Sequence, residues 1–125
     1  MSLEKKWIVD FDEDFKKKEF DNFPKEVRLK ILEMALVLQG VGPELGRPLV
    51  DTLYDSKHAN MKELRFNLGD ETWRVAFAFD TERKALLLTA GDKSGVNQKR
   101  FYKKLIKTAD ARFDAHLEKL KGKDR

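Results

Sequence analysis

The stretch Trp73-Arg74-Val75-Ala76-Phe77-Ala78-Phe79-Asp80 contains the clearest two-residue alternation in the sequence. Successive side chains of a strand point to opposite faces, so its four large apolar residues predict a face that packs on a hydrophobic core. The other face carries Arg74 beside two small residues, Ala76 and Ala78. We expect this second face to form a shallow floor that is open to a ligand, with one guanidinium group beside it.

Two further strands are predicted around this one. Residues 63–68 also alternate between apolar and polar side chains, and Gly69-Asp70 supplies the turn that joins the two strands. After a second turn at residues 80–84, residues 85–90 are apolar enough to form a third strand that is buried on both faces. Consecutive strands joined by short turns predict an antiparallel meander.

Helical patterns precede and follow the meander. A short strand at residues 7–11 leads into an acidic segment that predicts a first helix over residues 12–22. Pro24 begins a second helix that ends at Gly40, and the two are expected to form an antiparallel hairpin. Its extra apolar residues, Leu32, Leu36 and Val37, predict that the second helix is covered on more than one side.

A last amphipathic helix begins after Asn97, a suitable N-cap residue, because apolar residues then recur every four positions. The predicted class is α+β: an N-terminal strand and helical hairpin packed on one face of a small antiparallel sheet, with a C-terminal helix. Residues 1–125 are expected to form a single domain, with a frayed tail over about residues 121–125.

The composition narrows the possible functions. The chain has 125 residues, 41% of them hydrophobic and 38% charged, and contains no apolar run as long as the roughly 20 residues that span a membrane. The absence of a signal-peptide pattern predicts a cytoplasmic protein. Asp10-Phe11-Asp12-Glu13-Asp14 matches the start of a calcium loop, but Phe15 follows where glycine is required. With no cysteine and two histidines, we expect no metal and no cofactor.

Charge is distributed unevenly along the chain. Between Lys93 and Lys107 there are six basic residues and no acidic residue, whereas residues 10–21 contain six acids. This basic run predicts the end of the molecule that attracts an anion.

Cationic side chains converge on the face that Arg74 occupies. Arg65 and Arg74 both leave the apolar faces of neighbouring strands, and two guanidinium groups can together bind a phosphate. Lys93 and Tyr102 are expected to reach the same end of the sheet. The alternative is that Arg65 pairs with Glu63 or Glu71, while Arg74 only covers the sheet.

Several segments in order along the chain resemble one protein family. They are Gly46-Arg47-Pro48-Leu49-Val50-Asp51-Thr52-Leu53, Ser56-Lys57-His58, Lys62-Glu63-Leu64-Arg65-Phe66, the stretch Trp73–Asp80, Gly91-Asp92-Lys93-Ser94, and Phe101-Tyr102-Lys103-Lys104. Together they resemble the phage-derived, HigB-like branch of the RelE/ParE toxin superfamily. The family's fold, two N-terminal helices against an antiparallel sheet with a C-terminal helix, agrees with the predicted order of elements.

The resemblance implies a toxin of a type II toxin-antitoxin pair that cleaves mRNA on the ribosome without a metal. The RNA 2′-hydroxyl would attack its adjacent phosphate. Arg74 would stabilise the transition state, and Lys93 would contact the phosphate or protonate the leaving oxygen. Tyr102 would stack on a base or transfer a proton, and Arg65 would contact a phosphate. A cognate helix-turn-helix antitoxin would be the partner, and the free toxin is expected to be a monomer.

The general base is not identified by the resemblance, because Met61 and Glu63 occupy positions where RelE has lysines. Lys57, His58 and Lys62 are the candidates to replace it, although a loop histidine more often has no catalytic role. The same three residues, with Lys99, Arg100 and Lys103, are the predicted RNA or phosphate contacts. Two other functions stay open: a ParE-like toxin that inhibits DNA gyrase without cleaving RNA, and a non-enzymatic nucleic-acid-binding protein.

Overall fold

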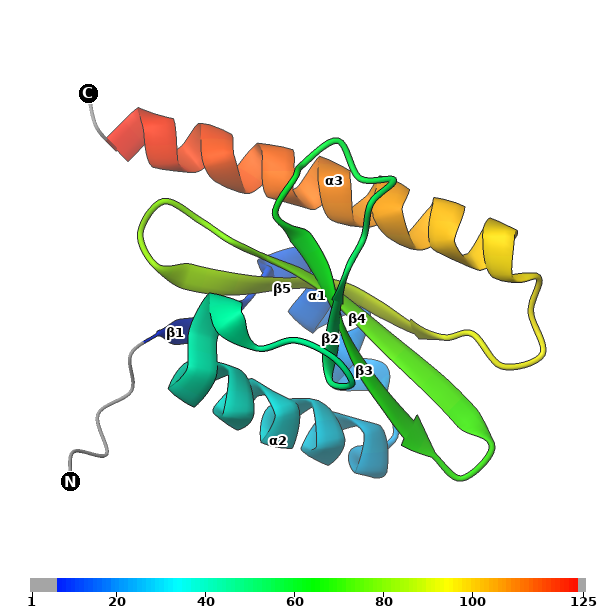
Figure 1. Ribbon diagram of the computed structural model, residues 1–125. Coiled ribbons are helices and arrows are strands. Elements are labelled where there is room, and N and C mark those ends of the chain that lie inside the picture. The colour runs from blue at the N-terminus through cyan, green and yellow to red at the C-terminus, as the bar shows by residue number, and fades with distance from the viewer. Residues whose placement is uncertain (1–6, 124–125) are drawn as a thin grey trace, which may run out of the picture.

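A computed structural model describes residues 7–123 of the chain, and within them a five-stranded sheet lies between helices. Figure 1 shows α2 on one side of the sheet and the long α3 on the other. The helices and strands are, in chain order, β1 (Ile8–Phe11), α1 (Glu13–Lys18), α2 (Lys25–Val41), β2 (Val50–Thr52), β3 (Met61–Leu68), β4 (Glu71–Phe79), β5 (Lys84–Asp92) and α3 (Gln98–Lys123). None of the helices in this range is both long and apolar enough to span a membrane.

The sheet has the order β1-β5-β4-β3-β2, so the strand that contains Trp73 to Phe79 is central. Strands β3, β4 and β5 form the predicted antiparallel meander, and Gly69 adopts a positive φ of 56° in the first turn. Two features were not predicted. β1 pairs in parallel with β5, which makes the sheet mixed, and β2 adds an edge strand over residues 50–52, where no strand was predicted.

The aromatic face of β4 packs as predicted. Phe77 and Val75 are fully buried there, in one core with Phe15 of α1 and with Ile31 and Leu38 of α2. Burial of a large apolar side chain contributes about 1.5–3 kcal/mol, so this layer supplies most of what holds the N-terminal helices to the sheet.

The opposite face of β4 differs from the prediction. Ala76 and Ala78 are fully buried in a second core beneath α3, where they meet Leu105, Ala109 and Phe113. The predictions of helices on one face only and of an open alanine floor are therefore wrong. The small side chains let α3 approach the sheet closely, and the apolar stripe of α3 needs such a surface to be buried.

The ends of the helices show smaller differences. The predicted helix over residues 12–22 is split into α1 and a 3-10 turn at Phe20–Asn22. Asn97 caps α3 as predicted, since its side-chain oxygen accepts a hydrogen bond from the Arg100 N–H at 3.0 Å. Helix α3 continues to Lys123, beyond the predicted start of the frayed tail, and residues 124–125 lie outside the described residues.

One expected burial is not found within the described chain. Leu36 of α2 is 63% exposed, and Leu32 and Val37 are also exposed, although their pattern predicted that a second side of α2 would be covered. Helix α2 packs on the sheet through a single face, which contains Val27, Ile31 and Leu38.

Candidate functional site

A buried cluster of polar side chains lies between the sheet and the start of α3. Arg74 of β4 and Glu63 of β3 are each 5% exposed, and Arg74 Nε lies 3.6 Å from Glu63 Oε1. The Tyr102 hydroxyl accepts a hydrogen bond from Arg74 Nε at 3.2 Å and donates one to Glu63 Oε1 at 2.8 Å. Arg74 Nη1 also donates to the Trp73 carbonyl at 2.9 Å. We call Arg74, Glu63 and Tyr102 the buried triad.

Strand register brings the triad together. In the β3–β4 pair Arg65 lies opposite Arg74, and Glu63 lies opposite Ala76. Residues that are directly opposite share a face of the sheet, so these side chains all lie on the face that α3 covers. Tyr102, in the second turn of α3, then lies over them from above.

Burial changes the proton affinities of the triad. It raises the pKa of Glu63, although the hydrogen bond from Tyr102 and the positive charge of Arg74 act against that rise. Burial also raises the pKa of the Tyr102 hydroxyl, and its hydrogen bond to Glu63 adds to the effect. Glu63 is therefore a carboxylate whose affinity for a proton is higher than that of an exposed glutamate.

Lys93 lies at the edge of the triad, as the sequence predicted. Its ammonium nitrogen is 5.7 Å from the centroid of the Tyr102 ring and 3.5 Å from Gln98 Oε1. The backbone places it there, because the Lys93 N–H donates to the Thr72 carbonyl at 2.8 Å. Burial, together with the nearby charge of Arg74, lowers the pKa of Lys93, so its proton is released more easily than from a free lysine.

Arg65 lies on the same face of the sheet as Arg74. Its partner is neither Glu63 nor Glu71, the two carboxylates that the sequence suggested. Its Nη1 lies 3.4 Å from Asp51 Oδ2, and the same oxygen accepts hydrogen bonds from Arg47. Glu71 instead accepts a hydrogen bond from the Trp73 indole at 3.1 Å. The arginine pair therefore exists as predicted, and each arginine has its own carboxylate.

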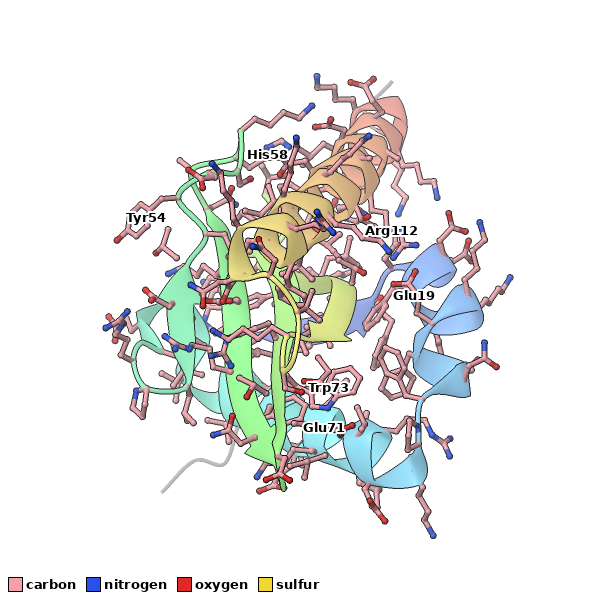
Figure 2. All side chains as sticks on the ribbon, turned by 90° about the vertical axis from the view of Figure 1, so that its right-hand side faces the viewer. Glu19, Tyr54, His58, Glu71, Trp73 and Arg112 are labelled. Carbon is pink, nitrogen blue, oxygen red and sulfur yellow. The ribbon has the colours of Figure 1, made fainter. Side chains whose placement is uncertain are left out.

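Lys57 and His58 do not join the triad. Lys57 forms an ion pair with Asp114 on α3, and His58 Nε2 lies 2.7 Å from the other oxygen of that carboxylate. Asp114 is twelve residues beyond Tyr102 in α3, which is roughly 18 Å along the helix. Figure 2 shows His58 against α3, far from Trp73 near α2. These two residues hold the loop between β2 and β3 against the helix.

Lys62 lies on the wrong face for a role beside Arg74. Its cross-strand neighbours are Phe77 and Thr52, and Phe77 points into the core beneath α2. The alternation of side chains along β3 therefore separates Lys62 from the triad. Lys99, Arg100 and Lys103 are exposed on the first turns of α3, next to Tyr102 in sequence.

Sequence reasoning considered Glu63 only as a partner for Arg65 and so missed its place in the triad. The signal was available, because Glu63 and Arg65 are two residues apart and must share a strand face. Asp51 was missed because three residues of polar edge strand give too short a pattern to detect. Within residues 7–123 no group of three or more His, Cys, Asp or Glu side chains is arranged to hold a metal.

The fold defined by this sheet, the N-terminal helices and the covering α3 is that of the RelE-like toxins. A solved structure of an arginine double mutant of the Escherichia coli toxin RelE in the free state aligns with 80% of this chain and 93% of its own. The TM-score is 0.51 at 13% identity, so this likeness concerns the fold alone.

The family model for "Phage derived protein Gp49-like (DUF891)" matches residues 18–114, and the chain belongs to this family. Two relatives from Mycobacterium tuberculosis (strain ATCC 25618 / H37Rv) are HigB2 and HigB3, both named as candidate toxins. HigB2 is 49% identical over 82 residues and HigB3 is 48% identical over 81, in each case 65% of this chain. The matched regions cover 40% of HigB2 and 68% of HigB3. The predicted HigB-like relationship is confirmed.

Proposed function

We propose that the protein is the toxin of a type II toxin-antitoxin system and acts as a metal-independent endoribonuclease that cleaves mRNA on the ribosome. Its relatives HigB2 and HigB3, which are named as candidate toxins, support the class. The observation that carries the chemistry is the Tyr102 hydroxyl, which lies between a buried carboxylate and a buried guanidinium group.

The first chemical step follows from these hydrogen bonds. The RNA 2′-hydroxyl oxygen forms a bond to the adjacent phosphorus and loses its proton to the Tyr102 oxygen, while the Tyr102 proton passes to Glu63. Glu63 can accept it because burial raises its pKa toward the working pH. Arg74 stabilises negative charge on the Tyr102 oxygen during this transfer through its Nε hydrogen bond.

The second half of the reaction needs an acid for the leaving group. As the bond between phosphorus and the 5′ oxygen breaks, Lys93 protonates that oxygen, which leaves as a free 5′-hydroxyl. The lowered pKa of Lys93 suits it to give up a proton. The other product is a 2′,3′-cyclic phosphate, and Arg65 at the same face stabilises the charge on the phosphate.

The matching test is Tyr102→Phe, which keeps the ring over the sheet and removes the hydroxyl. We expect RNA cleavage to fall by about 10²–10³-fold, the usual effect of removing one catalytic proton-transfer or hydrogen-bonding group. The readout is 5′-end sequencing of transcripts after brief induction. Tyr54→Phe is the control, because Tyr54 is 84% exposed and lies outside the triad.

Unchanged, clustered cleavage in the Tyr102→Phe strain would contradict the proposed chemistry. Arg74→Ala is a less informative variant, although Arg74 is the residue expected to stabilise the transition state. It would leave Glu63 buried without its countercharge, so a loss of toxicity could come from a loss of stability.

One observation favours a second candidate function. Arg74 and Glu63 are each 5% exposed, and their charges neutralise each other. Such a pair could serve only to hold α3 on the sheet, as in a toxin that inhibits DNA gyrase and has no catalytic site. Under that function, induction would trigger the DNA-damage response and leave transcripts intact. Transcript cleavage before any DNA-damage response would exclude it.

We also propose that a cognate helix-turn-helix antitoxin neutralises the protein in the cytoplasm and that the free toxin is a monomer. The family relationship supports the existence of an antitoxin. Co-expression with the neighbouring small reading frame should restore growth, and size-exclusion chromatography of the free toxin checks the monomer.

A further inference from the structure

A cavity of about 600 Å³ lies between α3 and the end of β5, beside Phe101, the residue that precedes Tyr102. Gly91, Phe101 and Leu105 line it, whereas no member of the buried triad does. Phe101 and Tyr102 are adjacent, with ring centroids 5.3 Å apart, so one ring faces the cavity and the next belongs to the triad. Gly91 is the cross-strand partner of Arg74. The cavity is therefore separate from the triad and next to it.

The inner end of the cavity is polar and fixed in place. Thr89 is 5% exposed and donates a hydrogen bond from Oγ1 to Glu19 Oε1 at 2.7 Å. Arg112 forms an ion pair with the other oxygen of Glu19 and donates to the Leu88 carbonyl at 2.8 Å. Figure 2 shows Arg112 reaching from α3 toward Glu19. Arg112 Nε also lies 3.7 Å from Asp12 Oδ2, so one guanidinium group fixes the positions of the oxygen atoms at this end.

A break in strand pairing contributes to this geometry. The register between β4 and β5 shifts at Ala76/Phe77, and both Leu88 and Thr89 then face the α3 side. Such irregularities turn a side chain away from regular alternation, and here the result is the Thr89 hydroxyl at the cavity wall.

The mouth of the cavity is cationic. Arg100 and Lys104 line it one helical turn apart on α3, and neither has an ion-pair partner among residues 7–123. Asp92 also lines the cavity, but its carboxylate already accepts hydrogen bonds from Thr72 N and from the Ser94 N–H and hydroxyl. Unpaired positive charge therefore remains at the entrance.

A nucleotide has groups that match the apolar wall, the polar inner end and the cationic mouth of the cavity. Its planar base would pack against Phe101 and the apolar wall, its polar edge would meet the oxygens at the inner end, and its phosphate would lie at Arg100 and Lys104. We propose that the cavity binds the nucleotide next to the cleaved phosphate. This rests on the proposed function, since the cavity adjoins the triad and one RNA strand can reach both.

The binding test does not depend on cleavage. The four 3′-mononucleotides are titrated separately into the ¹⁵N-labelled protein, and amide shifts are followed by NMR. We expect saturable shifts at Thr89, Ala90 and Gly91 for at least one nucleotide. Thr108→Trp, which fills the cavity from α3, should weaken that binding by about tenfold, as loss of one stacked base would.

Lys104→Ala and Lys107→Ala form a matched pair, because both remove one lysine charge from α3 and only Lys104 lines the cavity. Lys104→Ala should weaken mononucleotide binding by about threefold, and Lys107→Ala should leave it unchanged. Dispersed spectra of each variant show that it is folded.

Absence of shifts at the cavity amides with all four mononucleotides would overturn the proposal, as would equal effects of Lys104→Ala and Lys107→Ala. Protection of the cavity by the antitoxin, without mononucleotide binding, would identify it as a peptide site and also overturn it. If mononucleotides bind but the protein cleaves no RNA, the proposed function fails while the cavity assignment stands. If cleavage occurs without cavity binding, the reverse holds.

Discussion

The two faces of the sheet bury different chemistry. The face toward α2 carries large side chains such as Phe77 and Trp73. They pack against aromatic and aliphatic side chains of the N-terminal segment. The face toward α3 has Ala76 and Ala78 at its centre. It also carries Glu63, Arg74 and Thr89, which are polar or charged residues with 5% exposure each. One face supplies stability, and the other uses closely packed small residues to fix polar groups beneath a helix.

The largest expected effect tests the α2 face. Phe77→Ala removes a ring with no exposed surface from the centre of that core. We expect the free energy of unfolding to fall by about 3–5 kcal/mol, because the lost contacts leave a cavity. Urea denaturation followed by circular dichroism measures it. A loss below about 1 kcal/mol would show that this face is not the main source of stability.

A substitution at the centre of the other face tests whether it is closed. Ala78→Leu would force the α3 helix away from the sheet, since Ala78 is fully buried beneath it. We expect a loss of about 1–3 kcal/mol in the free energy of unfolding, and a drop in RNA cleavage as Tyr102 moves away from Glu63. An open floor would accept leucine with no change in either quantity, which would remove the contrast between the faces.

Acid should weaken the attachment of α3. The Asp80 side chain is fully buried, and burial alone would raise its pKa, but hydrogen bonds from His116 Nε2 and from the Lys84 and Glu82 N–H groups lower it. A depressed pKa contributes stability that is present above the unfolded value of 3.8 and is lost as the pH falls through the folded value.

Asp80→Asn should therefore reduce the free energy of unfolding at pH 7 by about 1 kcal/mol and make it less sensitive to acid. Denaturation midpoints between pH 7 and pH 3 give the comparison. Identical acid sensitivity in the variant and the wild type would refute this role of Asp80.

The smallest effect is expected at the far end of α3. Lys57→Ala removes an ion pair whose lysine side chain is 60% exposed. We expect only a marginal loss of stability, because solvent screens an exposed ion pair, and no change in RNA cleavage, because Lys57 is remote from the triad. A large loss of cleavage would mean that the site extends along α3 and that the sequence-based assignment of Lys57 to RNA binding is right.

The sequence predicted the parts of the fold that depend on local pattern. The alternation around Phe77 is long enough to define a strand, and Asn97 marks the start of α3 through its capping side chain. Partners are harder to predict. Ala76 and Ala78 are compatible both with a ligand-binding surface and with a surface on which a helix packs. A small side chain allows a neighbour to come close, but it does not indicate whether that neighbour is a ligand or a helix.

The site shows the same limit. The alternation of side chains along the strands correctly predicted that Arg65 and Arg74 share a face of the sheet. The position of Lys93 at the end of β5 correctly predicted that it lies near Tyr102. The actual partners depend on where β2 lies beside β3. Asp51 is directly opposite Glu63, but its carboxylate reaches Arg65, and Glu63 instead contacts Arg74 and Tyr102. A three-residue strand has no period from which that register could be read.

The most direct test of the account is the rate of RNA cleavage by Glu63→Gln on programmed ribosomes, measured against pH. The amide preserves the shape of the triad and an acceptor for Tyr102, but it cannot take a proton. We predict a loss of about 10²-fold or more in rate, while the wild-type rate rises with pH through the raised pKa of Glu63 and falls again as Lys93 deprotonates. Cleavage by Glu63→Gln at the wild-type rate, with the same pH profile, would contradict the claim that the α3 face carries the chemistry.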